Sequence, residues 1–149
     1  MIPSDMIIAV DFDGTIVTHE YPKIGREIPF AIDTLKKLQE DFHLRLILWT
    51  VREGSLLQEA VDYCKKRGLE FYAVNSNFPE EKRDKMESRK LKADLFIDDR
   101  NLGGLPDWGI IYQMIASGNQ FNLQSFSTPY VGEEYNTGKK KGFFKSMFG

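Results

Sequence analysis

A short apolar run that ends in two acidic residues most constrains what this chain can fold into. Residues 7–10 read Ile-Ile-Ala-Val, and Asp11 and Asp13 follow with only Phe12 between them. The run is short and β-branched enough for a buried strand, whose alternation places both acids on one side. Like charges at the end of a buried strand are costly unless a cation neutralises them or chemistry requires them. The alternative is an ordinary strand that runs into an Asp- and Gly-rich turn.

The same pattern returns near the other end of the chain. Residues 93–97 predict another short buried strand, and Asp98 and Asp99 follow it directly. A turn that leads into Arg100 would explain this second pair alone, but two strand-to-acid junctions in one small chain are hard to attribute to chance. Carboxylates are ligands for hard cations, so the two junctions favour a cation site.

Apolar runs and amphipathic segments alternate along the chain. This alternation is typical of a parallel sheet with helical connections, which predicts an α/β fold with helices on both faces. The carboxyl ends of the strands then meet at one edge, over which an irregular hairpin at residues 16–25 is expected to lie. The first helix is expected to start at Pro29 and to bury Phe30 on its apolar stripe. The expected strands are residues 7–10, 44–49, 71–74 and 93–97, and the expected helices are residues 29–41, 56–67, 79–91 and 108–117.

A threonine follows the second apolar run. Thr50 comes directly after residues 44–49 and is followed by Val51-Arg52-Glu53. A hydroxyl at the end of a central strand can donate to a phosphate oxygen without adding charge. The alternative is that Thr50 caps the next helix. Arg52, two residues further on, is a candidate for a second contact to an anionic substrate.

The run Asp-Phe-Asp-Gly-Thr, directly after Ile-Ile-Ala-Val, resembles the first motif of the haloacid dehalogenase-type (HAD) phosphohydrolases. Thr50 and the pair Asp98-Asp99 resemble the second and fourth motifs of that family. The resemblance covers residues 6–117 and implies a Rossmann-like three-layer sandwich around a parallel sheet of strand order 3-2-1-4. The segments between the motifs are used up by the expected elements, so a separate cap domain is not expected.

The resemblance also implies a role for each residue. Asp11 is expected to be the nucleophile and a metal ligand, and Asp13 the general acid and base, with its carbonyl on the metal. Asp98 or Asp99 would hold Mg²⁺, and Thr50 would hold a phosphoryl oxygen. The third motif of the family is a cation before the fourth strand. Lys90 is preferred for it, and the alternatives are Lys82, Lys85 and Lys92.

These roles imply Mg²⁺-dependent hydrolysis of phosphate monoesters through an aspartyl-phosphate, with a small phosphorylated metabolite as substrate. An acid at position 13 separates the chain from the dehalogenases and phosphonate-cleaving members of the family, which lack it. One alternative is a HAD-like domain kept as a binding or scaffold module, and another is a phosphatase for nucleic-acid ends. A site without a cap domain is expected to be covered by a second copy of the chain or by its C-terminal extension.

Composition bounds the remaining properties. The chain has 149 residues, enough for one core domain at residues 1–117 and an extension at 118–149. The net charge is −2 although four lysines lie near the C-terminus, so the acidic body argues against nucleic-acid binding. A single cysteine, Cys64, and the lack of a signal-like N-terminus favour the cytoplasm. The basic and aromatic end of the extension is expected to be a tail, a subunit contact or a weak membrane contact.

Overall fold

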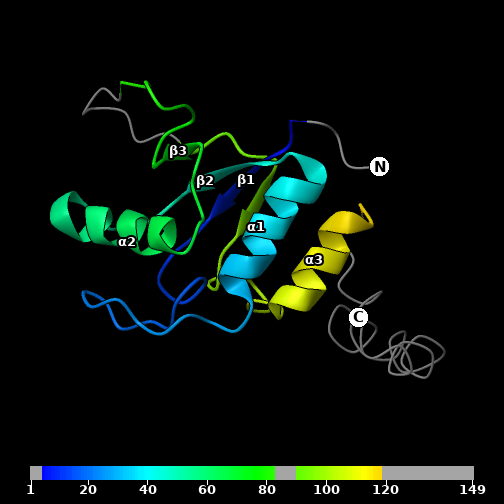
Figure 1. Ribbon diagram of the computed structural model, residues 1–149, viewed down its shortest axis with the longest axis horizontal. Helices are drawn as coiled ribbons and strands as arrows, with labels where there is room; N and C mark the ends of the chain where they lie inside the picture. The colour runs from blue at the N-terminus through cyan, green and yellow to red at the C-terminus, as the bar shows by residue number, and fades with distance from the viewer. Residues whose placement is uncertain (1–4, 83–89, 119–149) are drawn as a thin grey trace, which may run out of the picture.

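The fold is built on a four-stranded parallel sheet. In the computed structural model, which describes residues 5–82 and 90–118, the strand order is β3-β2-β1-β4 (Figure 1). This confirms the predicted α/β class, the parallel sheet and its strand order. β3 is short because only two of its residues pair with β2. The strands are β1 Ile7–Val10, β2 Arg45–Leu48, β3 Ala73–Val74 and β4 Leu95–Ile97.

Three helices flank the sheet: α1 Ala31–Phe42, α2 Gly54–Lys66 and α3 Trp108–Ala116. Their buried side chains form one apolar cluster with the strand residues that include Ile8 and Val10, and Figure 1 shows α1 and α3 side by side. A smaller cluster on the opposite face contains Ala9 and Ile47 and is covered by Leu91. Most of the helix expected at residues 79–91, which would form the third layer, lies outside the described residues, as does the extension beyond Gly118.

The first helix starts later than the sequence predicts. Phe30 occupies the N-cap with φ 66°, a left-handed conformation, and α1 begins only at Ala31. The helical stripe therefore does not include Phe30, whose side chain is 69% exposed. The prediction that Pro29 opens the helix and Phe30 packs in the core is wrong, because periodicity alone does not reveal a reversal of the backbone at the helix entry.

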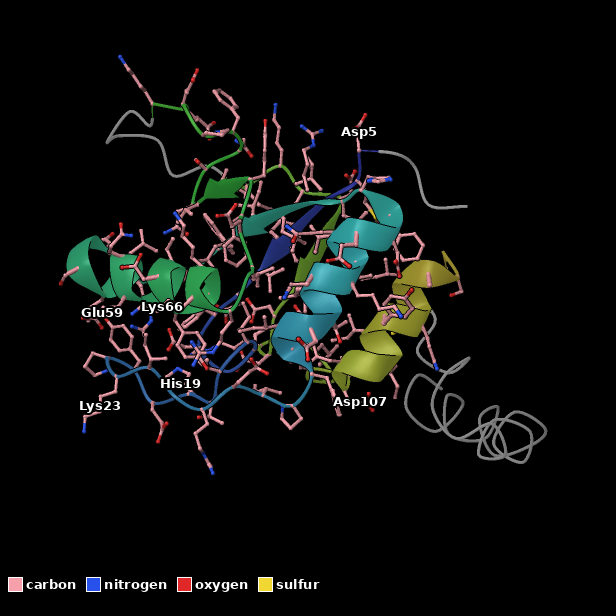
Figure 2. The ribbon with its side chains drawn as sticks, viewed as in Figure 1. Asp5, His19, Lys23, Glu59, Lys66 and Asp107 are labelled. Carbon is pink, nitrogen blue, oxygen red and sulfur yellow. The ribbon has the colours of Figure 1, made fainter. Side chains whose placement is uncertain are left out.

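The segment between β1 and α1 folds back over the carboxyl edge of the sheet. We call residues 16–28 the flap loop. Its two arms pair through hydrogen bonds from the Thr18 N–H to the Arg26 carbonyl (2.7 Å) and from the Ile28 N–H to the Ile16 carbonyl (2.8 Å), which confirms the predicted irregular hairpin. Figure 2 shows Lys23 at the outer side of this loop, pointing away from the sheet. Within the described residues, no helix has the length and apolar character needed to cross a membrane.

Candidate functional site

The register of the sheet brings the two acid-ended strands together. Val10, the last residue of β1, pairs with Ile97, the last residue of β4. The ladder continues for one more hydrogen bond, from the Asp11 N–H to the Ile97 carbonyl at 3.0 Å. Asp11 and Asp98 therefore leave neighbouring strands at the same level, as the sequence predicted from parallel pairing.

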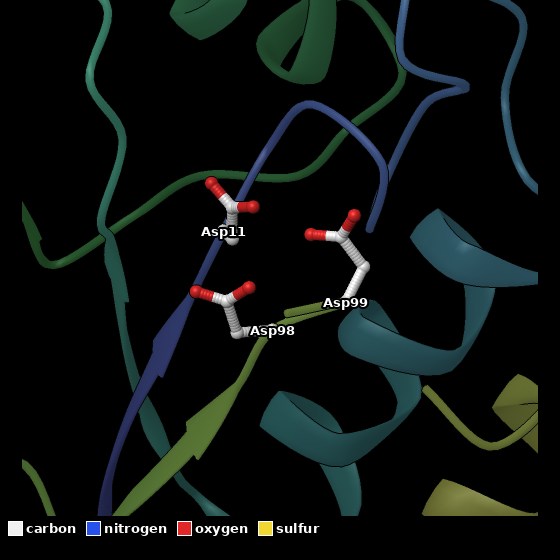
Figure 3. A group of neighbouring side chains, drawn as sticks. All are labelled: Asp11, Asp98 and Asp99. Carbon is white, nitrogen blue, oxygen red and sulfur yellow. The ribbon is translucent and has the colours of Figure 1, made fainter. Parts of the chain in front are cut away.

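Asp11, Asp98 and Asp99 form an acidic cluster at this edge. Each offers a carboxylate oxygen, and these oxygens all lie within 4.8 Å of one another. Figure 3 shows the three carboxylates around one space, with Asp11 reaching it from β1 and the other two from the end of β4. All three residues are half-buried. A hard divalent cation fits this set, because the set offers oxygens alone and none of its carboxylates forms a salt bridge with another described residue.

The electrostatics of Asp11 show the cost of this arrangement. The pKa of Asp11 is raised from its usual 3.8 to about 7, chiefly by burial and also by the nearby negative charges of Asp98 and Asp99, against a hydrogen bond from the backbone of Phe12. A carboxyl group that resists ionisation beside two others is a site where a bound cation would be strongly favoured.

Thr15 is a site residue that the analysis of the sequence did not single out. Its buried hydroxyl lies 3.5 Å from an oxygen of Asp11 and 3.5 Å from one of Asp99, and it accepts the Asp99 N–H at 3.1 Å. The indole N–H of Trp108, at the start of α3, donates to the Thr15 carbonyl at 3.2 Å. The threonine at the end of Asp-Phe-Asp-Gly-Thr was the available signal, since a buried hydroxyl beside two acids needs partners.

Asp13 is buried and paired with Arg52. The carboxylate accepts two hydrogen bonds from the guanidinium, from Nε at 2.8 Å and from Nη2 at 2.7 Å. The carboxylate of Asp13 is therefore occupied by Arg52 and is not one of the three carboxylates of the acidic cluster. The prediction that Arg52 contacts the substrate is wrong for this structure, because its side chain is 0% exposed and occupied by protein acceptors.

Thr50 follows β2 at the same edge and is half-buried. Its N–H donates to the side-chain oxygen of Asn75 at 2.8 Å, and its hydroxyl accepts the Arg52 N–H at 3.2 Å. The N-cap of α2 is Glu53, so the alternative role of Thr50 as the helix cap does not apply. Since the Thr50 oxygen accepts that bond, its proton can be directed to another acceptor.

Lys90 is exposed, and its amine lies 5.2 Å from the centre of the Phe96 ring on β4. Phe96 pairs in register with Ala9 and belongs to the same side of the sheet. Alternation carries that side on from Ala9 to Asp11, so Lys90 lies over the face that carries the predicted nucleophile. Lys82 and Lys92 are also exposed, and Lys85 lies outside the described residues.

The fold and the site define a class: a parallel α/β protein with an acidic cluster at the carboxyl edge of its sheet. No protein-family model and no curated protein matches the chain. A solved structure described as a conserved protein from Bacteroides thetaiotaomicron is 62% identical, with a TM-score of 0.71, and the match covers 79% of this chain and 98% of that one. The chain belongs to the family of that conserved protein.

Proposed function

We propose that this protein is a HAD-type phosphatase that hydrolyses phosphate monoesters in the presence of Mg²⁺. The observation that carries the proposal is the acidic cluster, in which Asp11 leaves β1 beside the pair that leaves β4. Phosphoryl transfer depends mainly on positioning and on neutralising charge, and this edge of the sheet offers a carboxylate nucleophile, a cation site and a hydroxyl donor.

Asp11 and Asp98 or Asp99 would hold Mg²⁺, with the carbonyl of Asp13 as a further ligand. The ion would neutralise charge on the phosphate and on the cluster. It would also favour the ionised form of Asp11, which burial opposes. Thr15 supports the arrangement by fixing Asp99 through the hydrogen bond from the Asp99 N–H.

In the proposed reaction, a carboxylate oxygen of Asp11 attacks phosphorus and the bond from phosphorus to the ester oxygen breaks. Asp13 gives its proton to the leaving oxygen, so that an alcohol departs and an aspartyl-phosphate remains on Asp11. A water molecule then attacks the phosphorus and gives a proton back to Asp13. The bond between Asp11 and phosphorus breaks, which releases inorganic phosphate and restores both carboxyl groups.

Thr50 and Lys90 are proposed to hold the phosphoryl oxygens. The Thr50 oxygen accepts the Arg52 N–H, and the hydroxyl proton can therefore be donated to a phosphoryl oxygen. Lys90 would bring a positive charge to the face of the sheet that carries Asp11. Lys90 is preferred over Lys92 because its amine lies over Phe96, two residues before Asp98 in the sequence.

The substrate is proposed to be a small phosphorylated metabolite, and the site to be covered by a second copy of the chain or by residues 118–149. The described part of the connections on either side of Thr50 contains the flap loop, α1, β2, α2 and β3, and these leave no room there for a cap domain. The free, buried Cys64 suits the cytoplasmic location that we propose.

The proposal is tested by measuring turnover of 4-nitrophenyl phosphate with Mg²⁺, with Mn²⁺ and with a chelator. The wild-type protein should be active only with a divalent cation, and Asp11→Asn should remove at least about 99% of that activity. Equal turnover by the wild type and Asp11→Asn would reject the nucleophile. A wild type that binds Mg²⁺ but turns over no phosphate ester would favour the scaffold alternative.

A further inference from the structure

The guanidinium of Arg52 joins the turn after β1, the flap loop and the first turn of α2. Besides its two bonds to Asp13, it donates to the carbonyls of Pro22 and Lys23 in the flap loop, at 3.1 and 2.9 Å. It also reaches the carbonyl of Leu56 in the first turn of α2, at 3.5 Å. All five N–H donors of the guanidinium therefore have an acceptor within the protein.

Two aromatic rings border the same group. The guanidinium carbon lies 5.2 Å from the centre of the Phe12 ring and 5.3 Å from that of Tyr21, which belongs to the flap loop. The side chain of Arg52 is 0% exposed and that of Asp13 is 7% exposed. The ion pair is therefore shielded from water, and the flap loop supplies part of the shield.

Stability alone does not explain a buried ion pair at this position. Removing two charges from water costs about as much as their attraction returns, and an apolar pair of similar size is often as stable. What the bidentate contact does supply is orientation, because two parallel hydrogen bonds fix the plane of the Asp13 carboxylate. They use one lone pair on each oxygen and leave another on each for a proton.

We propose that Arg52 is a positioning residue, which holds the Asp13 carboxylate in the orientation for proton transfer and makes that orientation depend on the flap loop. The inference rests on the proposed function, in which Asp13 protonates the leaving oxygen. Arg52 acts through Asp13 and does not contact the substrate. The carbonyls of Pro22 and Lys23 connect the pair to the loop, so a displacement of the loop would disturb the proton-transfer group.

The test compares two leaving groups in Arg52→Lys and Arg52→Gln. 2,4-Dinitrophenol leaves without a proton, whereas benzyl alcohol needs one, and kcat/KM reports the steps up to formation of the aspartyl-phosphate. General acid catalysis contributes about 100-fold or more, so Arg52→Gln should lower kcat/KM by about that factor for benzyl phosphate. The loss for 2,4-dinitrophenyl phosphate should stay below about tenfold. Arg52→Lys keeps the positive charge but cannot form two parallel hydrogen bonds to the carboxylate. Its kcat/KM for benzyl phosphate should therefore lie between those of the wild type and Arg52→Gln.

Arg45→Lys and Arg45→Gln are the matched controls. Arg45 also lies on an aromatic ring, 5.0 Å from the centre of Tyr72, but at the amino end of β2. These variants should have only a small effect on kcat/KM, and the effect should be the same for both esters. A second control is Asp13→Asn, in which the further change Arg52→Lys should add no loss for benzyl phosphate, because a residue that acts only through Asp13 has no effect without it.

Equal losses for the two esters in folded Arg52→Lys, or additive losses with Asp13→Asn, would overturn the positioning role. A rise in kcat/KM for benzyl phosphate would overturn it as well, since Arg52 would then restrain Asp13. These outcomes leave the proposed function intact, because the wild type is still active. A wild type without Mg²⁺-dependent turnover of 2,4-dinitrophenyl phosphate would overturn both.

Discussion

Gly14 and Asp99 lie so close together that the Asp99 carboxylate fills the position of a Cβ on Gly14. Gly14 also has φ +85°, in the left-handed region that favours glycine. The turn after β1 therefore depends on a residue without a side chain, and the same absence lets Asp99 approach the acidic cluster. The backbone at the end of β1 and the Asp99 carboxylate after β4 are in this way mutually constrained.

Gly14→Ala should weaken Mg²⁺ binding at least about tenfold, because the new methyl group displaces Asp99. It should also lower the free energy of unfolding by about 1–3 kcal/mol through backbone strain. Gly104→Ala is a matched control, with φ +79° and nothing within 4 Å of the added Cβ. Calorimetric titration with Mg²⁺ and urea unfolding should show similar strain in both variants and weakened binding in Gly14→Ala alone. Equal Mg²⁺ affinity in the two variants would contradict this prediction.

Mg²⁺ affinity should depend on pH through Asp11. The pKa of Asp11 is about 7 in the folded protein, raised from 3.8, so between about pH 4 and 7 the folded state keeps a proton that the unfolded state has lost. The contribution of Asp11 to the free energy of unfolding is therefore full at low pH and is lost as pH rises through this window. Below pH 7 the proton competes with Mg²⁺, and the affinity should fall up to about tenfold per pH unit.

Thermal denaturation with and without Mg²⁺ at pH 6 and pH 8 measures this effect. The increase in melting temperature on adding Mg²⁺ should be larger at pH 8. Asp11→Asn removes the titrating group, so the remaining response to Mg²⁺ should lose most of its dependence on pH. An increase that is the same at both pH values in the wild type would argue against a role for Asp11 in binding the metal.

Trp108→Phe should lower the free energy of unfolding by destabilising the turn that carries Thr15. The substitution keeps an aromatic ring in the core but removes the bond to the Thr15 carbonyl, and an unpaired buried carbonyl costs about 1–3 kcal/mol of unfolding free energy. Tyr112→Phe, which removes an exposed bond to Asp41, is the control and should cost about 0.5 kcal/mol or less. Urea unfolding compares the two. A smaller effect of Trp108→Phe than of Tyr112→Phe would show that the indole bond does not support the turn.

Lys90→Met should lower kcat for 4-nitrophenyl phosphate by about 100-fold or more, because removing a preorganised positive partner of the phosphoryl group costs about 3–4 kcal/mol. Lys92→Met is the control, since Lys92 is also exposed and lies two residues away. Methionine keeps most of the length of the side chain, so the comparison isolates the charge. A greater loss of kcat in Lys92→Met than in Lys90→Met would assign the phosphoryl contact to Lys92 instead.

Local patterns predicted the strands and the acids at their ends well. β1 was predicted with its observed bounds. The other three strands are shorter than predicted, and the difference lies at their ends, where pairing with a neighbour decides whether a residue joins the sheet. Phe30 was misassigned because its left-handed backbone leaves no mark on apolar periodicity.

The sequence by itself determined the class of fold and the acids that meet at the carboxyl edge. Apolar runs that end in acids are local signals, and alternation with amphipathic segments restricts the sheet to parallel pairing. Only the tertiary structure decided the partner of Asp13. Arg52 is buried because the flap loop brings the carbonyls of Pro22 and Lys23 to it, and such contacts between distant residues follow from packing rather than from any local pattern.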